Sequence, residues 1–104
     1  MYEESYEFPA IIINHGSEDY EIRIYDFKEV TIYDDSLDAC YSQIQEALEG
    51  EIYKYICLNK EIPSPTPKED IPLDYNQTLF TIKVDTEQAI KKSKRIGVIV
   101  PDSL

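Results

Sequence analysis

The chain has 104 residues and a formal net charge of −11 at pH 7, which favours a single domain with a modest hydrophobic core. Hydrophobic residues make up 42% of it and nine residues are Tyr, a composition too apolar and aromatic for a disordered chain. A chain this acidic repels nucleic-acid phosphates and anionic membranes and favours basic partners, although acidity also keeps many small proteins soluble.

The negative charge is unevenly distributed along the sequence. Residues 1–40 carry a net charge of −9, residues 41–74 carry −4, and residues 75–104 carry +2. This polarity predicts two surfaces with different roles, with a chance excess in a short tail as the alternative.

The first predicted strand covers residues 6–13. Its unbroken run of three isoleucines at 11–13 favours a strand that is covered on both faces. Pro9 lacks an N–H for the ladder, so we expect it at the strand start or on an unpaired side. A polar turn over residues 14–19 follows.

Two further strands are predicted to complete an antiparallel meander. Residues 20–25 alternate apolar and charged side chains and give the clearest period-2 signal in the sequence. A short link at residues 26–29 leads to a third strand over residues 30–33. The first two strands are expected to form a hairpin.

A long amphipathic helix is predicted next. Asp35 or Ser36 can cap it, because each offers a side-chain oxygen to the free N–H groups of the first turn, and Asp38 adds charge that the helix dipole favours. The apolar positions recur at spacings of three and four, at Leu37, Tyr41, Ile44, Leu48, Ile52 and Tyr55. Gly50 interrupts this pattern at a cost of about 1 kcal/mol relative to Ala, which predicts either a bend or a break into two helices.

The two cysteines, Cys40 and Cys57, both fall in this predicted helix. Their separation corresponds to roughly 25 Å of helix, so we expect no disulfide between them. Reduced thiols favour a cytoplasmic location. The sequence opens without a basic region or a long apolar run, so we expect neither a signal peptide nor a membrane span.

The second half begins with a proline-rich connector at residues 61–72. Alternating prolines exclude a helix there and predict a stiff, extended segment. We then expect a strand over residues 79–85, a short basic helical turn over residues 86–93 and a last strand over residues 94–100.

No set of residues predicts catalysis, a metal or a cofactor. His15 is the only histidine and falls in the first turn without a partner pattern, so we expect it to be exposed to solvent. Three isolated glycines do not form a phosphate-binding loop. The enzymatic alternative is a two-metal nuclease site built from Asp19, Asp26, Asp34, Asp35, Asp38 and Asp85. Such a site needs inward-facing carboxylates on strands, which this pattern does not supply, so we expect no enzyme.

Several short motifs occur in a characteristic order and spacing. They lie at Phe8–Ile12, Tyr25–Phe27, Asp35–Ala39, Glu61–Pro67, Thr81–Asp85 and Val98–Pro101. In this order they resemble the HicB-type antitoxins of type II toxin–antitoxin systems, and the resemblance covers nearly the whole chain. No single motif is specific, so the order and spacing carry the resemblance.

The resemblance implies an α+β fold, a partial ribonuclease H-like arrangement without catalytic acids, built from the three-stranded meander, the helix and one or two further strands. It also implies a partner, a HicA-like toxin, which is a small basic mRNA interferase with a catalytic His. The antitoxin covers that active site. The net charge of −11 would then complement a basic RNA-binding surface.

The sequence departs from the family pattern in two places. Residues 25–30 lack the prolines and the glycine that are usual there, which marks a divergent relative. The HicB-like domain is expected over residues 1–100, and the tail at 101–104 lies where a DNA-binding domain often opens. The chain is therefore expected to be part of a longer protein or a relative without that domain. Despite the basic segment 91–95, we expect no DNA binding by this chain.

The leading hypothesis is an antitoxin that neutralises a HicA-like ribonuclease. The alternatives are an acidic inhibitor or nucleic-acid mimic of another basic protein, for example one encoded by a phage, and an enzyme with a residual nuclease site. The expected contact residues are acids of the hairpin and the helix start, Glu18, Asp19, Glu21, Asp34, Asp35 and Asp38. Association through them should be sensitive to salt. We also expect self-association through one exposed sheet edge, without a preference for either edge.

Overall fold

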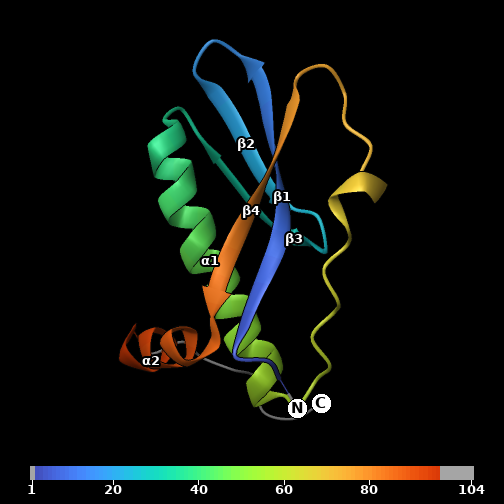
Figure 1. Ribbon diagram of the computed structural model, residues 1–104. Helices are drawn as coiled ribbons and strands as arrows, with labels where there is room; N and C mark the ends of the chain where they lie inside the picture. The colour runs from blue at the N-terminus through green and yellow to red at the C-terminus, as the bar shows by residue number, and fades with distance from the viewer. Residues whose placement is uncertain (1, 97–104) are drawn as a thin grey trace.

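The computed structural model describes residues 2–96 (Figure 1). The elements in chain order are β1 (Ser5–Gly16), β2 (Asp19–Ile24), β3 (Phe27–Asp34), α1 (Leu37–Cys57), the 3₁₀ turn η1 (Lys68–Asp70), β4 (Gln77–Asp85) and α2 (Thr86–Ile96). The four strands form one antiparallel sheet in the order β3-β2-β1-β4. Helix α1 lies across one face of this sheet, and we call the opposite face the open face.

The predicted antiparallel meander is confirmed, with Ile12, Ile22 and Ile32 aligned across its three strands. The third strand begins earlier than expected, at Phe27. The Phe27 ring is buried beneath α1 and packs edge-on against Phe8, with ring centroids 5.0 Å apart. The sequence pattern did not predict this start of β3, because a single aromatic residue among charged residues gives no alternating signal.

The main core lies between the sheet and α1. Its buried members are Phe8, Ala10, Ile22, Ile24, Phe27, Val30, Cys40, Ile44, Leu48, Ile52, Ile82, Val84 and Ala89. These residues follow the period-2 pattern of the strands and the 3.6-residue period of α1, so both periodicities converge on one apolar layer. Both cysteines are free, with Cys40 in this core and Cys57 exposed.

Helix α1 begins and ends with capping contacts. Ser36 Oγ accepts a hydrogen bond from the Ala39 N–H at 3.3 Å, as the sequence predicted for the N-cap. The helix continues without interruption through Gly50, so a break into two helices is wrong. The residues two positions before and after Gly50, Leu48 and Ile52, are both fully buried. Burying each of them contributes roughly 1.5–3 kcal/mol, which exceeds the cost of one glycine.

The open face is also covered in part, as the isoleucine run predicted. Ile11 and Ile13 of β1 form a second, smaller buried cluster with Ile71 of the connector between α1 and β4 (residues 58–76). The connector passes from the end of α1 to the start of β4 (Figure 1), and it is extended apart from η1. Thr66 fastens it to the sheet, because its Oγ1 donates to Asp26 Oδ1 at 2.5 Å and its N–H donates to Asp26 Oδ2 at 3.0 Å.

Pro9 lies inside β1 and not at its start. It sits opposite Thr81 of β4, and its carbonyl accepts a hydrogen bond from the Tyr25 N–H at 3.0 Å. Tyr25 follows Ile24, the last residue of β2. The missing N–H of Pro9 therefore faces the point where β2 has ended, and no ladder bond is lost.

Strand β4 pairs with β1 along its whole length, from Gln77 opposite Ile13 to Asp85 opposite Ser5. A side chain of α1 reaches its outer edge, since Gln45 Nε2 donates to the Lys83 carbonyl at 3.0 Å. Buried Glu49 of α1 accepts a hydrogen bond from Lys92 at 3.1 Å and so joins the two helices.

The prediction of a strand over residues 94–100 is wrong where the structure tests it, because residues 94–96 belong to α2. Lys94 and Arg95 are basic side chains in the last turn, where the helix dipole favours positive charge. Residues 97–100 of that predicted strand and the tail at 101–104 lie outside the described residues. Among residues 2–96, neither helix has the length and apolarity needed to cross a membrane.

Candidate functional site

Five of the six predicted contact acids belong to the segments at one end of the molecule, at the top of Figure 1, whereas Glu21 is buried within β2. Glu18 is in the turn between β1 and β2, and Asp19 opens β2. The pairing of Tyr20 with Asp34 brings the start of β2 beside the end of β3, where α1 also begins. We call this group the acidic end, and it consists of Glu18, Asp19, Asp34, Asp35 and Asp38.

Asp34 organises the junction from which α1 starts. Its Oδ1 accepts a hydrogen bond from the Ser36 N–H at 3.0 Å, and its Oδ2 accepts one from Gln43 Nε2 at 2.8 Å. These two hydrogen bonds, the first above all, lower the pKa of Asp34 below its ordinary value, so the carboxylate stays charged. These contacts thus fix the position of the Asp34 carboxylate and favour its charged form.

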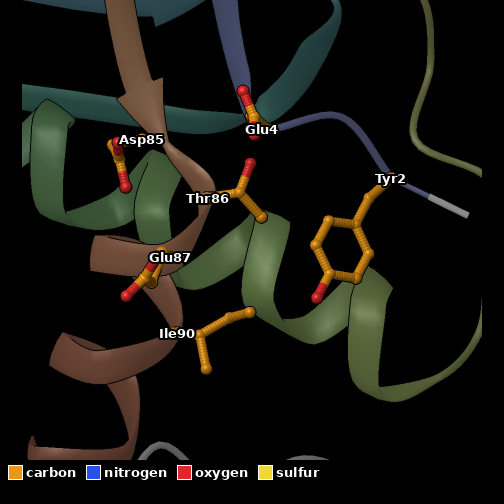
Figure 2. Close-up of a pocket in the computed structure, with 6 residues that line it drawn as sticks. All are labelled: Tyr2, Glu4, Asp85, Thr86, Glu87 and Ile90. Carbon is orange, nitrogen blue, oxygen red and sulfur yellow. The ribbon is translucent and has the colours of Figure 1, made fainter.

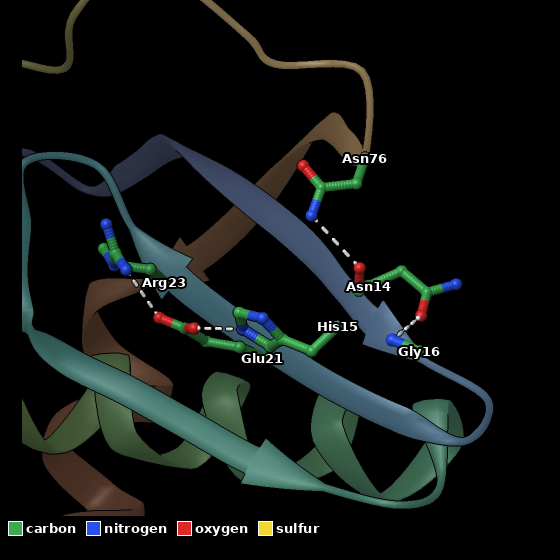
Figure 3. A network of polar contacts seen from close by, with 6 residues as sticks. All are labelled: Asn14, His15, Gly16, Glu21, Arg23 and Asn76. Atoms are coloured by element: carbon green, nitrogen blue, oxygen red, sulfur yellow. Dashed lines mark hydrogen bonds and ion pairs between the residues drawn. The ribbon is translucent and has the colours of Figure 1, made fainter.

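Glu21 is almost completely buried, with 3% of the residue exposed, and it lies on the open face. An imidazole and a guanidinium group hold its carboxylate, as Figure 3 shows. Nε2 of His15 lies 2.7 Å from Oε1, and Arg23 Nη2 donates to Oε2 at 2.6 Å. Both oxygens are therefore engaged within the chain, and His15, which we expected to lack a partner, has one.

The pKa of Glu21 reflects competing effects. Burial alone would raise it, because a carboxylate loses its hydration in an apolar environment. The hydrogen bonds from His15 and Arg23, together with their charge, outweigh burial and lower the pKa below its ordinary value. The lowered pKa favours the ionised form of Glu21, whose negative charge offsets that of Arg23 on the open face.

The loop that leads into β4 forms part of the same end, and the sequence pattern did not single it out. Asn14 N–H donates to the Asn76 carbonyl at 3.1 Å, and Asn76 Nδ2 donates to the Asn14 carbonyl at 3.1 Å (Figure 3). Asp74 and Gln77 exchange two further hydrogen bonds, of 2.9 and 3.1 Å. These bonds hold Tyr75 in an ordered loop although its side chain is fully exposed. An aromatic residue within a polar turn was the only signal available in advance.

The carboxylates considered for a nuclease site do not converge. Within residues 2–96, no group of three or more His, Cys, Asp or Glu side chains is placed to hold a metal ion. Asp26 accepts hydrogen bonds from Thr66, and Asp85 Oδ1 accepts one from the Gln88 N–H at 2.9 Å. Asp26 therefore fastens the connector to the sheet, and Asp85 caps the first turn of α2.

A hollow of about 420 Å³ lies at the start of α2, at the other end of the sheet (Figure 2). Thr86 fixes the N-terminal segment there, because its Oγ1 donates to the Glu3 carbonyl at 2.7 Å and its N–H donates to the Glu4 carbonyl at 2.9 Å. Carboxylates of Glu4, Asp85 and Glu87 line the hollow. Thr86 fastens the N-terminal segment and Asp85 caps α2, so we assign this region a structural role.

Comparison with known proteins finds a similarity in structure. No protein-family model matches the chain, and no curated protein matches its sequence. A similar solved structure is the crystal structure of the N-terminal domain of the antitoxin HicB from Burkholderia pseudomallei, with a TM-score of 0.65 and 19% sequence identity. The match covers 76% of this chain and 98% of that domain. The expected α+β, partial ribonuclease H-like class is confirmed, and the chain has the fold of the HicB antitoxin N-terminal domain.

Proposed function

We propose that this chain is a non-enzymatic antitoxin that binds and neutralises a HicA-like mRNA interferase by covering its basic RNA-binding and active site. The observation that carries this proposal is the likeness to the N-terminal domain of an antitoxin, which extends over 98% of that domain. The order of sequence motifs led to the same family independently of the structure.

The charge of the molecule supports the same partner. A ribonuclease that binds RNA presents cations to phosphates, and a protein inhibitor can present carboxylates to the same cations. The acidic end offers five carboxylates within a net charge of −11. Exposed charges of this kind accelerate association and lose their effect over a screening length of about 8–10 Å at physiological ionic strength. Association should therefore slow as salt is added.

The proposal is tested by co-expressing the chain with the small basic protein encoded beside it, purifying the complex and measuring RNA cleavage. The expected result is a stable complex in which cleavage is suppressed. A neighbouring ribonuclease that neither binds the chain nor is inhibited by it would overturn the proposal. Recovery of a different basic protein as the inhibited partner would establish the alternative, an acidic inhibitor or nucleic-acid mimic.

A pair of charge variants tests the placement of the contact surface. Glu18, Asp19 and Asp35 are exposed acids of the acidic end, and none of their substitutions removes the Ser36 cap. Changing all three to Lys should slow association with the ribonuclease by roughly tenfold or more at low salt. The matched control changes three exposed acids near the N-terminus, Glu3, Glu4 and Glu7, to Lys and adds the same charge. Equal slowing by both triple variants would contradict the placement, since it would report net charge alone.

A further inference from the structure

Most of the large exposed apolar side chains lie at the same end of the molecule as the acidic end. Among residues 2–96, the large apolar side chains that remain exposed are Tyr2, Tyr33, Tyr41, Leu73 and Tyr75. Tyr33 directly precedes Asp34, Tyr41 lies in the second turn of α1, and the other two belong to the loop before β4. Only Tyr2 lies at the opposite end of the molecule, near the start of α2.

Tyr75 and Tyr33 are the most exposed of these, at 102% and 66%. A fully exposed aromatic ring buries no area in its own fold, so folding does not require it there. The Asn14–Asn76 and Asp74–Gln77 hydrogen bonds nevertheless hold the backbone around Tyr75 in one conformation. A rigid tyrosine of this kind loses little conformational freedom when a partner covers it.

The two tyrosines lie on opposite sides of the open face at this end of the sheet, with Tyr33 paired opposite Glu21 and Tyr75 beside His15. Pairing aligns Gln77, Ile13, Glu21 and Tyr33 in a row across the four strands on the open face. Three strand spacings of about 4.8 Å place Tyr33 roughly 15 Å from the β4 side of the sheet, where the Tyr75 loop begins. A standard interface of about 800 Å² per partner is wide enough to cover both.

The tyrosine rings of this surface suit a cationic partner. Arg23 and His15 lie near them on the open face, and both contact the buried carboxylate of Glu21, whose negative charge offsets that of Arg23. The faces of tyrosine rings attract ammonium and guanidinium groups. This chain already shows such contacts, with Lys60 Nζ 4.8 Å from the Tyr55 ring centroid and Lys28 Nζ 5.9 Å from that of Tyr25.

We propose that Tyr33 and Tyr75 are the aromatic anchors of the docking surface, and that they pack against Lys or Arg side chains of the basic RNA-binding surface of the ribonuclease. The carboxylates of the acidic end form the charged rim of this surface. The inference rests on the proposed function, because it names the residues that hold the same partner. Interfaces concentrate their binding energy in a few buried aromatic and arginine residues, with charged residues around them.

The test measures the Kd of the co-purified basic ribonuclease for four proteins by calorimetry: the wild type, Tyr33→Ala, Tyr75→Ala and the double variant. We expect each single change to raise Kd by about tenfold and the double change to raise it further. Tyr2→Ala is the matched control, because Tyr2 is also exposed, at 48%, but lies at the opposite end. It should change Kd by less than about twofold.

A salt series separates the anchors from the rim. The tyrosine variants should keep the wild-type dependence of Kd on salt, whereas the triple acid reversal at Glu18, Asp19 and Asp35 should weaken that dependence. Circular dichroism checks that each variant is folded. Tyr75→Ala should fold normally, because the exposed ring makes no buried contact.

The outcomes are distinct. If the double variant binds as tightly as the wild type, the proposal that Tyr33 and Tyr75 are anchors is overturned and the proposed function stands. The same conclusion follows if Tyr2→Ala weakens binding as much as Tyr75→Ala. If the wild type does not bind the ribonuclease, both proposals are overturned.

Discussion

The two faces of the sheet are covered in different ways. The face toward α1 buries thirteen residues in one apolar cluster, whereas the open face buries three isoleucines together with the charged pairs of Glu21. Apolar packing is nondirectional and cumulative, whereas each polar contact fixes one side chain in one place. The difference indicates that the α1 face supplies most of the stability, and that the open face mainly sets the positions of exposed groups.

The largest effect should come from the α1 face. Leu48→Ala removes a fully buried side chain from the main cluster and should lower the free energy of unfolding by about 2–5 kcal/mol. Ile71→Ala, on the open face, should lower it by about 2 kcal/mol or less, because the connector can move to fill the space. Urea unfolding of both variants measures the difference. An equal or larger loss for Ile71→Ala would contradict the comparison.

An intermediate effect is expected at Glu21, through its lowered pKa. A carboxylate whose pKa is lower in the folded than in the unfolded chain adds stability above the unfolded pKa, and that stability is lost as pH falls through the folded pKa. Glu21→Gln should therefore cost roughly 1–3 kcal/mol at pH 7, and the deficit should shrink below the ordinary value of 4.5.

Urea unfolding of wild type and Glu21→Gln at a series of pH values from about 3 to about 7, which extend from below to well above the ordinary carboxylate pKa of 4.5, checks this dependence. Asp34 also has a lowered pKa, but it is present in both proteins, so their difference isolates Glu21. Glu18→Gln serves as the control for the loss of one exposed carboxylate. A deficit that stayed constant across this range would show that Glu21 acts through packing alone.

The smallest effect should be a gain on the α1 face. A Cβ added at Gly50 would meet no atom within 4 Å, so Gly50→Ala should raise the free energy of unfolding by about 0.5–1 kcal/mol. Gly16→Ala is the control, because its φ of 151° strains any residue with a Cβ and should lower stability. Thermal unfolding of both measures the sign, and a lower melting temperature for Gly50→Ala would contradict this prediction.

Periodic patterns in the sequence predicted the elements of the main core. The alternation at residues 20–25 and the apolar spacing from Leu37 to Tyr55 correctly indicated the meander and the helix, because these periods reflect which side of an element is buried. The isoleucine run at 11–13 also correctly indicated cover on both faces. Such patterns could not predict that β4 pairs with β1, because strand pairing depends on contacts between residues that are distant in sequence.

The candidate site was predictable only in part. Charge counting identified the acidic end, but it could not distinguish Glu21, whose environment depends on two cationic neighbours and on burial. It also missed Tyr75, because the loop that carries this exposed ring is held by Asn14–Asn76 contacts across 62 positions of sequence. The strand predicted over residues 94–100 is wrong at residues 94–96, because the helix predicted over residues 86–93 continues through them. Lys94 and Arg95 lie in its last turn, where the helix dipole favours positive charge.

The hydrogen bond from Gln45 to the Lys83 carbonyl has a consequence for the behaviour of concentrated protein. Outer strands of sheets present free carbonyl and N–H groups on which further strands can add, and such addition starts fibre growth. Gln45 occupies one of these carbonyls on β4, a strand rich in β-branched and aromatic residues. A strand arriving at this edge would have to displace the glutamine, so growth of fibres from β4 is hindered at Lys83.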